Sequence, residues 1–190
     1  MPGKSKSMYC FLIASLPELS LDAPAPMTVQ EFDVLCSEEL SQEEMAALTA
    51  FDGTVTPEFS ESRSLNGLYN AYGKFELYLR NRIARQRAEK AGVQLELPEP
   101  PESYSEFDFI AGTLASASDP AEREMMIDAL RWYFIDEQLL CKEFHFNALC
   151  AYRLKLIIVN KYRDRQLEPG RKRFDAALER LSLNTFRQEQ

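Results

Sequence analysis

One uninterrupted stretch near the C-terminus, residues 119–165, constrains the fold of this chain most strongly. It opens with Asp119, a favoured N-cap residue, and Pro120 at the first helical position, and Glu122 stands three residues after the cap. No glycine and no further proline follow before Pro169, and the stretch is rich in aromatic and aliphatic side chains. It therefore predicts long helices that the rest of the protein or a partner must cover. We expect a bend or break near residues 142–147, because one straight helix of about 40 residues would not fit a compact domain.

Two capping boxes predict a pair of short helices in the N-terminal part of the chain. Thr28 and Glu31 form the first box, and Ser41 and Glu44 form the second, whose helix should stop at Asp52. The apolar residues before them, 8–16, include a β-branched isoleucine and lead into a proline-containing turn. We expect this N-terminal segment to be short and extended, with the start of a helix as the alternative.

A longer helix is predicted for residues 65–91, ended by Gly92. Its expected buried stripe consists of apolar side chains spaced three and four residues apart: Leu68, Tyr72, Phe75, Leu79 and Ile83. The second half of the helix is strongly basic, with Arg80, Arg82, Arg85 and Arg87. We interpret these arginines first as a solvated face paired with the acidic segment that follows, and alternatively as a contact for an acidic protein partner. RNA is the weakest alternative, because no stacking aromatic residues are interleaved with the arginines.

A segment rich in proline and glutamate, residues 96–104, separates two helical parts of the chain. We predict an N-terminal helical unit at residues 1–95, with the long basic helix, and a C-terminal helical unit at residues 105–190, packed as one globular domain. A capping-box pattern at Ser103 and an amphipathic pattern after Pro169 predict two more helices. Residues 75–82 align with residues 154–161, which suggests two related helical units. The predicted fold class is an all-α multi-helix bundle with long antiparallel helices.

The charge pattern and the hydropathy exclude several classes of protein. The net charge of −8 argues against a general nucleic-acid binder. Residues 61–95 carry 7 basic and 3 acidic side chains, whereas residues 96–130 carry 1 and 9, so the charge lies in blocks that can pair internally or face partners. No stretch approaches the roughly 20 apolar residues that span a bilayer, and the N-terminal apolar run lacks a clean signal-peptide cleavage site. We therefore expect a cytoplasmic protein.

The sequence offers little catalytic chemistry. Its 7 glycines are scattered, so there is no glycine-rich phosphate loop, and the single histidine, His145, stands between Phe144 and Phe146. The 4 cysteines form no C-x-x-C pair, and one histidine leaves too few soft ligands for an ordinary zinc site. The glutamate pairs at residues 38–39 and 43–44 are interpreted as solvated helix faces rather than metal ligands. We expect no enzymatic activity, no metal and no cofactor.

Two stretches resemble known proteins. Residues 9–19 (YCFLIASLPEL), followed by Thr28, Glu31, Phe32 and Cys36, resemble an uncharacterised bacterial family whose members are encoded with the components of V-type (archaeal-type) rotary ATPases. Residues 151–162 (AYRLKLIIVNKY), with the earlier helix that bears Leu77, look like the helical units of the C subunit of those ATPases, which is called the d subunit in eukaryotes. The C subunit is an all-helical socket that sits on the membrane rotor ring and receives the foot of the central shaft.

The resemblance implies a reduced stalk component similar to the C subunit, because members of that family have three helical units and this chain has room for about two. The implied partners are the central shaft and the membrane rotor ring, so the protein would be peripheral to the inner membrane through protein contacts only, without nucleic acid. The expected shaft contact is the basic half of the long helix, and a second candidate surface consists of Lys161, Arg163 and Arg165. An assembly factor for the same ATPase, an unrelated helical adaptor and an unrecognised enzyme are the alternatives.

Overall fold

The computed structural model describes residues 7–56, 62, 65–97, 104, 107, 119–139 and 145–164. Within these residues the chain forms six α-helices and no strand, which confirms the all-α fold class. The helices are α1 (Ser7–Ser15), α2 (Val29–Glu39), α3 (Gln42–Thr49), α4 (Gly67–Ala91), α6 (Pro120–Glu137) and α7 (Phe146–Asp164).

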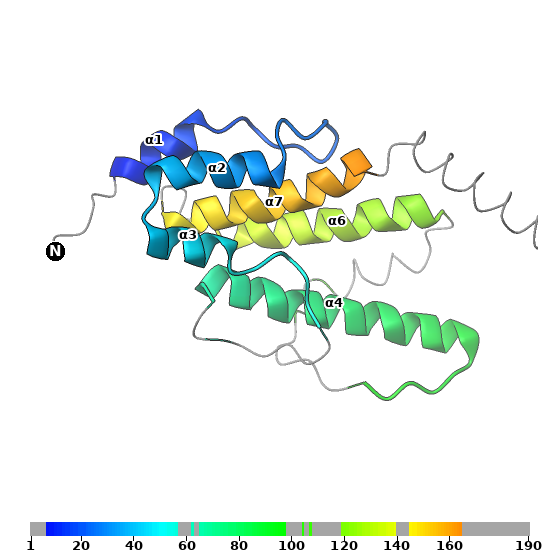
Figure 1. Cartoon of the computed structure of the whole chain (residues 1–190). Coiled ribbons are helices and arrows are strands. Elements are labelled where there is room, and N and C mark those ends of the chain that lie inside the picture. Colours follow the sequence, from blue (N-terminus) through cyan, green and yellow to red (C-terminus); the bar gives the residue numbers. More distant parts are fainter. Residues whose placement is uncertain are drawn as a thin grey trace, which may run out of the picture.

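Helices α6 and α7 lie side by side in the middle of the molecule, and the other four are arranged around them (Figure 1). On one side, α1 and α2 pack against α7, and α3 packs against α2. On the other side, α4 packs against both α6 and α7 and runs antiparallel to α6 (Figure 1). One core cluster contains Phe32 of α2, Tyr69 of α4 and Leu149 of α7, so helices from both predicted units share one hydrophobic core.

The expectation of an extended N-terminal segment is wrong, because Ser7–Ser15 forms α1. This stretch contains no glycine or proline, and it is apolar on all sides, so its sequence shows no helical periodicity. Leu12 is buried in the common core, and the Tyr9 hydroxyl donates a hydrogen bond to the Glu44 carboxylate. The helix ends just before Leu16, whose position ahead of Pro17 disfavours helical backbone angles.

Both predicted capping boxes are confirmed, and they set the start of α2 and α3. The Thr28 hydroxyl accepts a hydrogen bond from Glu31 N at 3.1 Å, while Thr28 N donates to Glu31 Oε2 at 2.7 Å. Ser41 and Glu44 form the same reciprocal pair at the start of α3. The boxes satisfy backbone groups that a helix end leaves without partners, and this explains two short helices in succession.

The long helix α4 begins and ends close to the predicted residues, and Gly92 caps it in the left-handed conformation at φ 67°. Four of the five predicted stripe residues are buried, and Ile83 is half-buried. The predicted stripe was nevertheless too narrow, because Tyr69, Glu76 and Tyr78 are also buried. The first half of α4 is covered on several sides, by α6 and α7 and by Tyr104, whose carbonyl accepts a hydrogen bond from the Tyr78 hydroxyl at 3.1 Å.

The long C-terminal stretch is divided into two helices, as expected. Asp119 caps α6, with its Oδ1 accepting a hydrogen bond from Ala121 N at 2.9 Å, and Pro120 is the first helical residue. The helix ends at Glu137, a few residues earlier than the predicted break, and α7 starts at Phe146. The helices predicted after Ser103 and after Pro169, and most of the linker at residues 96–104, lie outside the described residues.

Candidate partner-binding groove

The second half of α4 and the first half of α6 separate from each other and leave an open groove with a volume of about 560 Å³. The two helices are in contact where Phe75 of α4 stacks on Phe134 of α6, with ring centroids 4.1 Å apart. From there they diverge toward the C-terminal end of α4 (Figure 1). A volume of this size is in the range that proteins use to bind ligands or the side chains of a partner.

One face of α4 forms the first wall of the groove. Its lining residues are Arg80, Ile83, Ala84, Arg87, Ala88 and Ala91. Spacings of three and four residues place them on one side of the helix, and the three alanines are small enough to leave space above the backbone. The other wall is the face of α6 that bears Glu124, Ile127 and Arg131.

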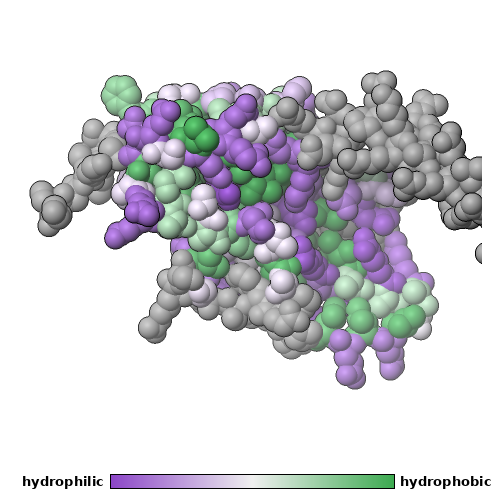
Figure 2. All heavy atoms as spheres, in the orientation of Figure 1, coloured by the Kyte–Doolittle hydropathy of each residue, from purple (hydrophilic) through white to green (hydrophobic). Residues whose placement is uncertain are grey.

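The segment after α4 completes the groove with apolar side chains. Gly92 reverses the chain, Val93 N donates a hydrogen bond to Ala88 O at 2.9 Å, and Val93 and Leu95 line the groove. These two residues are 60% and 43% exposed and adjoin the apolar residues of the α4 wall. Figure 2 shows hydrophobic side chains gathered at the end of α4 and over the segment that follows it, at the lower right.

A buried ionic network closes the groove where α4 and α6 meet. Arg131 donates to both oxygens of Glu76, from Nε to Oε2 at 2.8 Å and from Nη2 to Oε1 at 2.7 Å. Arg131 Nη1 also donates to Asp128 Oδ1 at 2.6 Å, and Arg80 Nε donates to Glu76 Oε1 at 2.9 Å. The Glu76 and Asp128 side chains are 2% and 1% exposed and that of Arg131 is 13% exposed, so these three members lie within the core. The Arg80 side chain, at 47% exposed, lies at the edge of the groove.

The network fixes the ionisation of its members. Burial alone would raise the pKa of Glu76, but the hydrogen bonds and the charge of Arg131, reinforced by Arg80, hold the pKa of that carboxyl below its ordinary value. Burial would likewise lower the pKa of Arg131, and the Glu76 carboxylate raises it instead. Glu76 is therefore a carboxylate and Arg131 a guanidinium at neutral pH, and they hold α4 against α6 at the apex of the groove.

The four predicted arginines of α4 do not lie on one surface. Arg80 and Arg87 line the groove, whereas Arg82 and Arg85 do not. Two residues along a helix differ by roughly 200° in direction, so Arg85 points almost opposite to Arg87. Arg82 and Arg85 both have interaction partners within the protein. Two of the four arginines thus share the groove and two face elsewhere, and the role of these arginines as a partner contact stays a prediction.

The second predicted surface is only partly described. Lys161 belongs to α7, is half-buried and has an interaction partner within the protein. The Arg163 side chain and the whole of Arg165 lie outside the described residues. Their proposed role as a partner contact therefore stays a prediction.

A second buried ion pair joins α7 to α2, away from the groove. Arg153 donates to Asp33, from Nε to Oδ1 at 2.8 Å and from Nη2 to Oδ2 at 3.1 Å, and its Nη1 donates to Phe51 O at 2.6 Å. All three nitrogens of the Arg153 guanidinium group thus donate to protein oxygens. We assign this pair to packing of α2 on α7 rather than to ligand binding.

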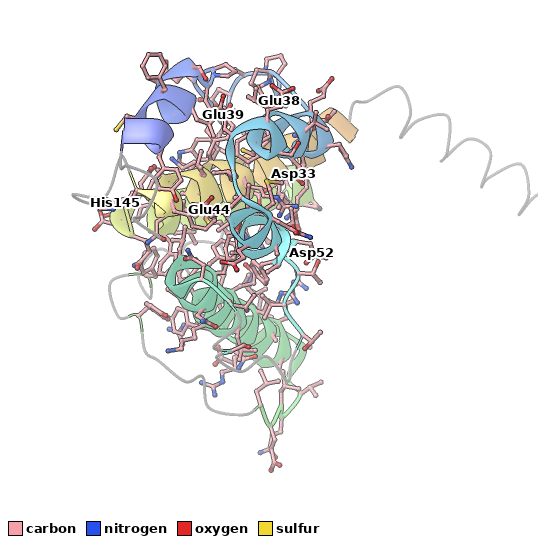
Figure 3. All side chains as sticks on the ribbon, turned by 60° about the vertical axis from the view of Figure 1, so that its left-hand side comes forward. Asp33, Glu38, Glu39, Glu44, Asp52 and His145 are labelled. Atoms are coloured by element: carbon pink, nitrogen blue, oxygen red, sulfur yellow. The ribbon has the colours of Figure 1, made fainter. Side chains whose placement is uncertain are left out.

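In the described part of the chain, we also examined whether acidic side chains outside the network gather near His145 or could hold a metal ion. Among the described residues there is no group of three or more histidine, cysteine, aspartate and glutamate side chains placed to hold a metal ion. Figure 3 shows His145 at the start of α7, well apart from Asp33 and Asp52. Glu38 and Glu39 are exposed on α2, as expected for a solvated helix face.

Sequence reasoning missed Glu76, Asp128 and Arg131 of the buried network, and it missed the groove itself. Glu76 lies between apolar residues of the predicted stripe, and Asp128 follows Ile127 in an apolar stretch of α6. A carboxylate inside such a stripe signals a buried ion pair, because an unpaired charge would be too costly to bury. The sequence held no comparable signal that would pair Glu76 with Arg131, 55 residues away.

Comparisons with protein-family models, with curated proteins and with solved structures found no match to this chain. Within the part of the chain that the structure describes, none of the helices has the length and apolar character needed to cross a bilayer.

Proposed function

We propose that this protein is a non-catalytic stalk component of a V/A-type proton- or sodium-translocating ATPase, similar in role to the C subunit. In this role it couples the central shaft to the membrane ring through protein contacts and is peripheral to the inner membrane on its cytoplasmic side. The assignment to this ATPase rests on two resemblances: residues 9–19 resemble an uncharacterised bacterial family encoded with components of that complex, and residues 151–162 resemble its C subunit. The all-α fold supports it, because the C subunit is also all-helical.

The observation that carries a binding role is the open groove between α4 and α6. Most of its lining is apolar or small, yet Val93 and Leu95 remain substantially exposed. Exposed apolar surface next to charged residues is typical of a site that another molecule covers. The charged groups at its apex are paired with each other, which suits a rigid docking surface better than acid–base catalysis.

The experiment that tests the proposal is affinity purification of the tagged protein from solubilised membranes of its own source, followed by native mass spectrometry. Stoichiometric recovery with the rotor ring and the central shaft is the expected result. Recovery with free ATPase components or assembly intermediates alone would instead make the protein an assembly factor. Recovery without any ATPase component would contradict the proposal and leave an unrelated helical adaptor.

A further inference from the structure

The three arginines that line the groove differ in what they can offer to a ligand. Arg131 binds Glu76 and Asp128 through Nε, Nη1 and Nη2, and its side chain is only 13% exposed, so it offers little to a ligand. Arg80 binds Glu76 through Nε and Val55 O through Nη1, and its side chain is 47% exposed. Within the described residues, Arg80 Nη2 has no partner, and Arg87 has neither a hydrogen bond nor an ion pair. Arg80 Nη2 and the Arg87 guanidinium are therefore the cationic groups available in the groove.

These two positions have a defined spacing. Arg80 and Arg87 are seven residues apart, which is two helical turns or about 10.5 Å along the axis. Ile83 and Ala84 lie between them on the same face. The groove thus presents a cation, an apolar floor and a second cation in a straight line along α4.

The dimensions favour one face of a helix as the occupant. The wall from Arg80 to Ala91 extends about 16 Å at 1.5 Å per residue. A helix is about 10 Å across, and the groove is open to solvent along its length. A helix would therefore enter by one side only and keep its other side in water, which requires an amphipathic sequence.

The charges favour carboxylates on that helix. Arg80 and Arg131 carry two positive charges, and Glu76 and Asp128 carry two negative charges, so the network is neutral as a whole. Arg87 lies outside this network, and Glu124, the acidic residue of the facing wall, has an interaction partner other than Arg87. A partner side chain that reaches Arg87 gains a charge-assisted hydrogen bond if it is a carboxylate and meets repulsion if it is a lysine or arginine.

We propose that the groove between α4 and α6 binds an amphipathic helix of a protein partner through two carboxylates seven residues apart and the apolar side chains between them. One carboxylate pairs with Arg87 and the other with Arg80 Nη2, while the apolar side chains cover Ile83, Ala84 and Leu95. The inference rests on the proposed function, because it names the chemistry of the partner at the predicted docking site.

A second copy of this chain is the competing occupant. On α2, Glu31 and Glu38 are seven residues apart and exposed, and the 62% exposed Val34 lies between them. This face has the same spacing of charges as the groove. Self-association through α2 would be head-to-tail and would produce rings or filaments.

The test uses the full-length protein and three synthetic helical peptides, with binding measured by fluorescence anisotropy. The first peptide carries two glutamates seven residues apart with leucines between them. The second has lysines in place of the glutamates, and the third has the glutamates five residues apart, which turns them about 140° away from each other. The protein variants are Arg87→Glu and the matched control Arg85→Glu, which makes the same charge change on the opposite side of α4.

The expected result is saturable binding of the first peptide that weakens at least tenfold with Arg87→Glu and less than twofold with Arg85→Glu. Arg87→Glu should also improve binding of the lysine peptide, because the charges are then exchanged. Circular dichroism and urea unfolding of each variant confirm that the fold is intact. Equal binding of all three peptides, equal effects of the two variants, or no saturable binding up to about 1 mM would overturn the inference.

Two further outcomes separate this inference from its alternatives. Light scattering could show that the protein self-associates and that both Arg87→Glu and Glu38→Lys abolish this association. That result would assign the groove to a second copy and overturn the inference. Recovery of ATPase components that is unchanged by Arg87→Glu would leave the proposed function standing and remove the groove from it. Peptide binding with the expected pattern, but no ATPase component in the purification, would keep the groove and remove the proposed function.

Discussion

Arg131 donates two hydrogen bonds to the carboxylate of Glu76, at 2.8 and 2.7 Å, across the interface between α6 and α4. The pair is almost removed from water, since the two side chains are 13% and 2% exposed. Planar groups that bind through two parallel hydrogen bonds fix distance and orientation together. This pair therefore sets the point from which α4 and α6 diverge, and the shape of the groove depends on it.

The first prediction concerns the removal of the Glu76 charge. Glu76→Gln keeps the shape of the side chain but leaves Arg131 with a buried charge that Asp128 alone offsets. Breaking a buried ion pair in this way costs roughly 3 kcal/mol in the free energy of unfolding. Urea unfolding followed by circular dichroism measures the loss directly.

The matched control for this prediction is the ion pair of Asp136 and Lys155, in which the carboxylate faces solvent. Asp136 is 49% exposed, so Asp136→Asn should change the free energy of unfolding by less than about 1 kcal/mol. Equal losses in Glu76→Gln and Asp136→Asn would contradict the role assigned to the buried pair.

The second prediction concerns pH. The pKa of Glu76 lies below its ordinary value of 4.5 in the folded protein, because Arg131 and Arg80 outweigh the effect of burial. Under acidic conditions the unfolded chain thus binds more protons at Glu76 than the folded protein does. The ionised Glu76 therefore stabilises the fold above pH 4.5, and this stabilisation is lost as the pH falls further. The difference in unfolding free energy between the native protein and Glu76→Gln should shrink steadily between about pH 5 and pH 3. A difference that stays constant over this range would contradict the ionised pair.

The third prediction concerns two buried cysteines. Cys36 of α2 and Cys150 of α7 are both 0% exposed, and burial raises the pKa of each thiol to about 12. At pH 8 roughly one thiol in ten thousand is then ionised, and the thiolate is the reactive form. In the native protein both should resist iodoacetamide for hours, whereas in urea both should react within minutes, as mapped by peptide mass spectrometry. Rapid labelling of either residue without urea would show that α2 is not packed on α7 as described.

Local signals predicted the helices well where the chain itself caps them. The boxes at Thr28 and Ser41 and the cap at Asp119 involve residues within a few positions, so their hydrogen bonds can be read from neighbouring sequence. Helix α1 was not the preferred interpretation because its uniformly apolar sequence lacks the alternation of apolar and polar sides that marks a helix. Its contacts with α2 and α7 come from distant parts of the chain.

The groove was not predicted, for a reason of the same kind. The basic character of α4 was visible, but which arginines share a surface depends on where α6 lies. Arg80 and Arg87 line the groove because α6 diverges from them. The three small alanines beside them indicate a groove only when the open space above them is known. The separation of two helices is a property of tertiary packing that no local pattern contains.

The last prediction contrasts the two glycines at the ends of α4. Gly92 has φ 67°, a backbone angle that other residues adopt at a cost in free energy. Gly92→Ala should therefore lower the free energy of unfolding by about 1 kcal/mol, even though the added carbon meets no atom within 4 Å. Gly67 also has open space around it but starts the helix with ordinary backbone angles, so Gly67→Ala should raise the free energy of unfolding by roughly 0.5 kcal/mol.

Gly92→Asn provides the control, since asparagine tolerates the left-handed conformation and should lose less stability than alanine. Gly92 also directs Val93 and Leu95 to the groove. Gly92→Ala should therefore lower both the free energy of unfolding in urea and the affinity for the glutamate peptide. Gly67→Ala should leave peptide binding unchanged. Unimpaired binding in Gly92→Ala at full helix content would mean that the segment after α4 is not a wall of the site.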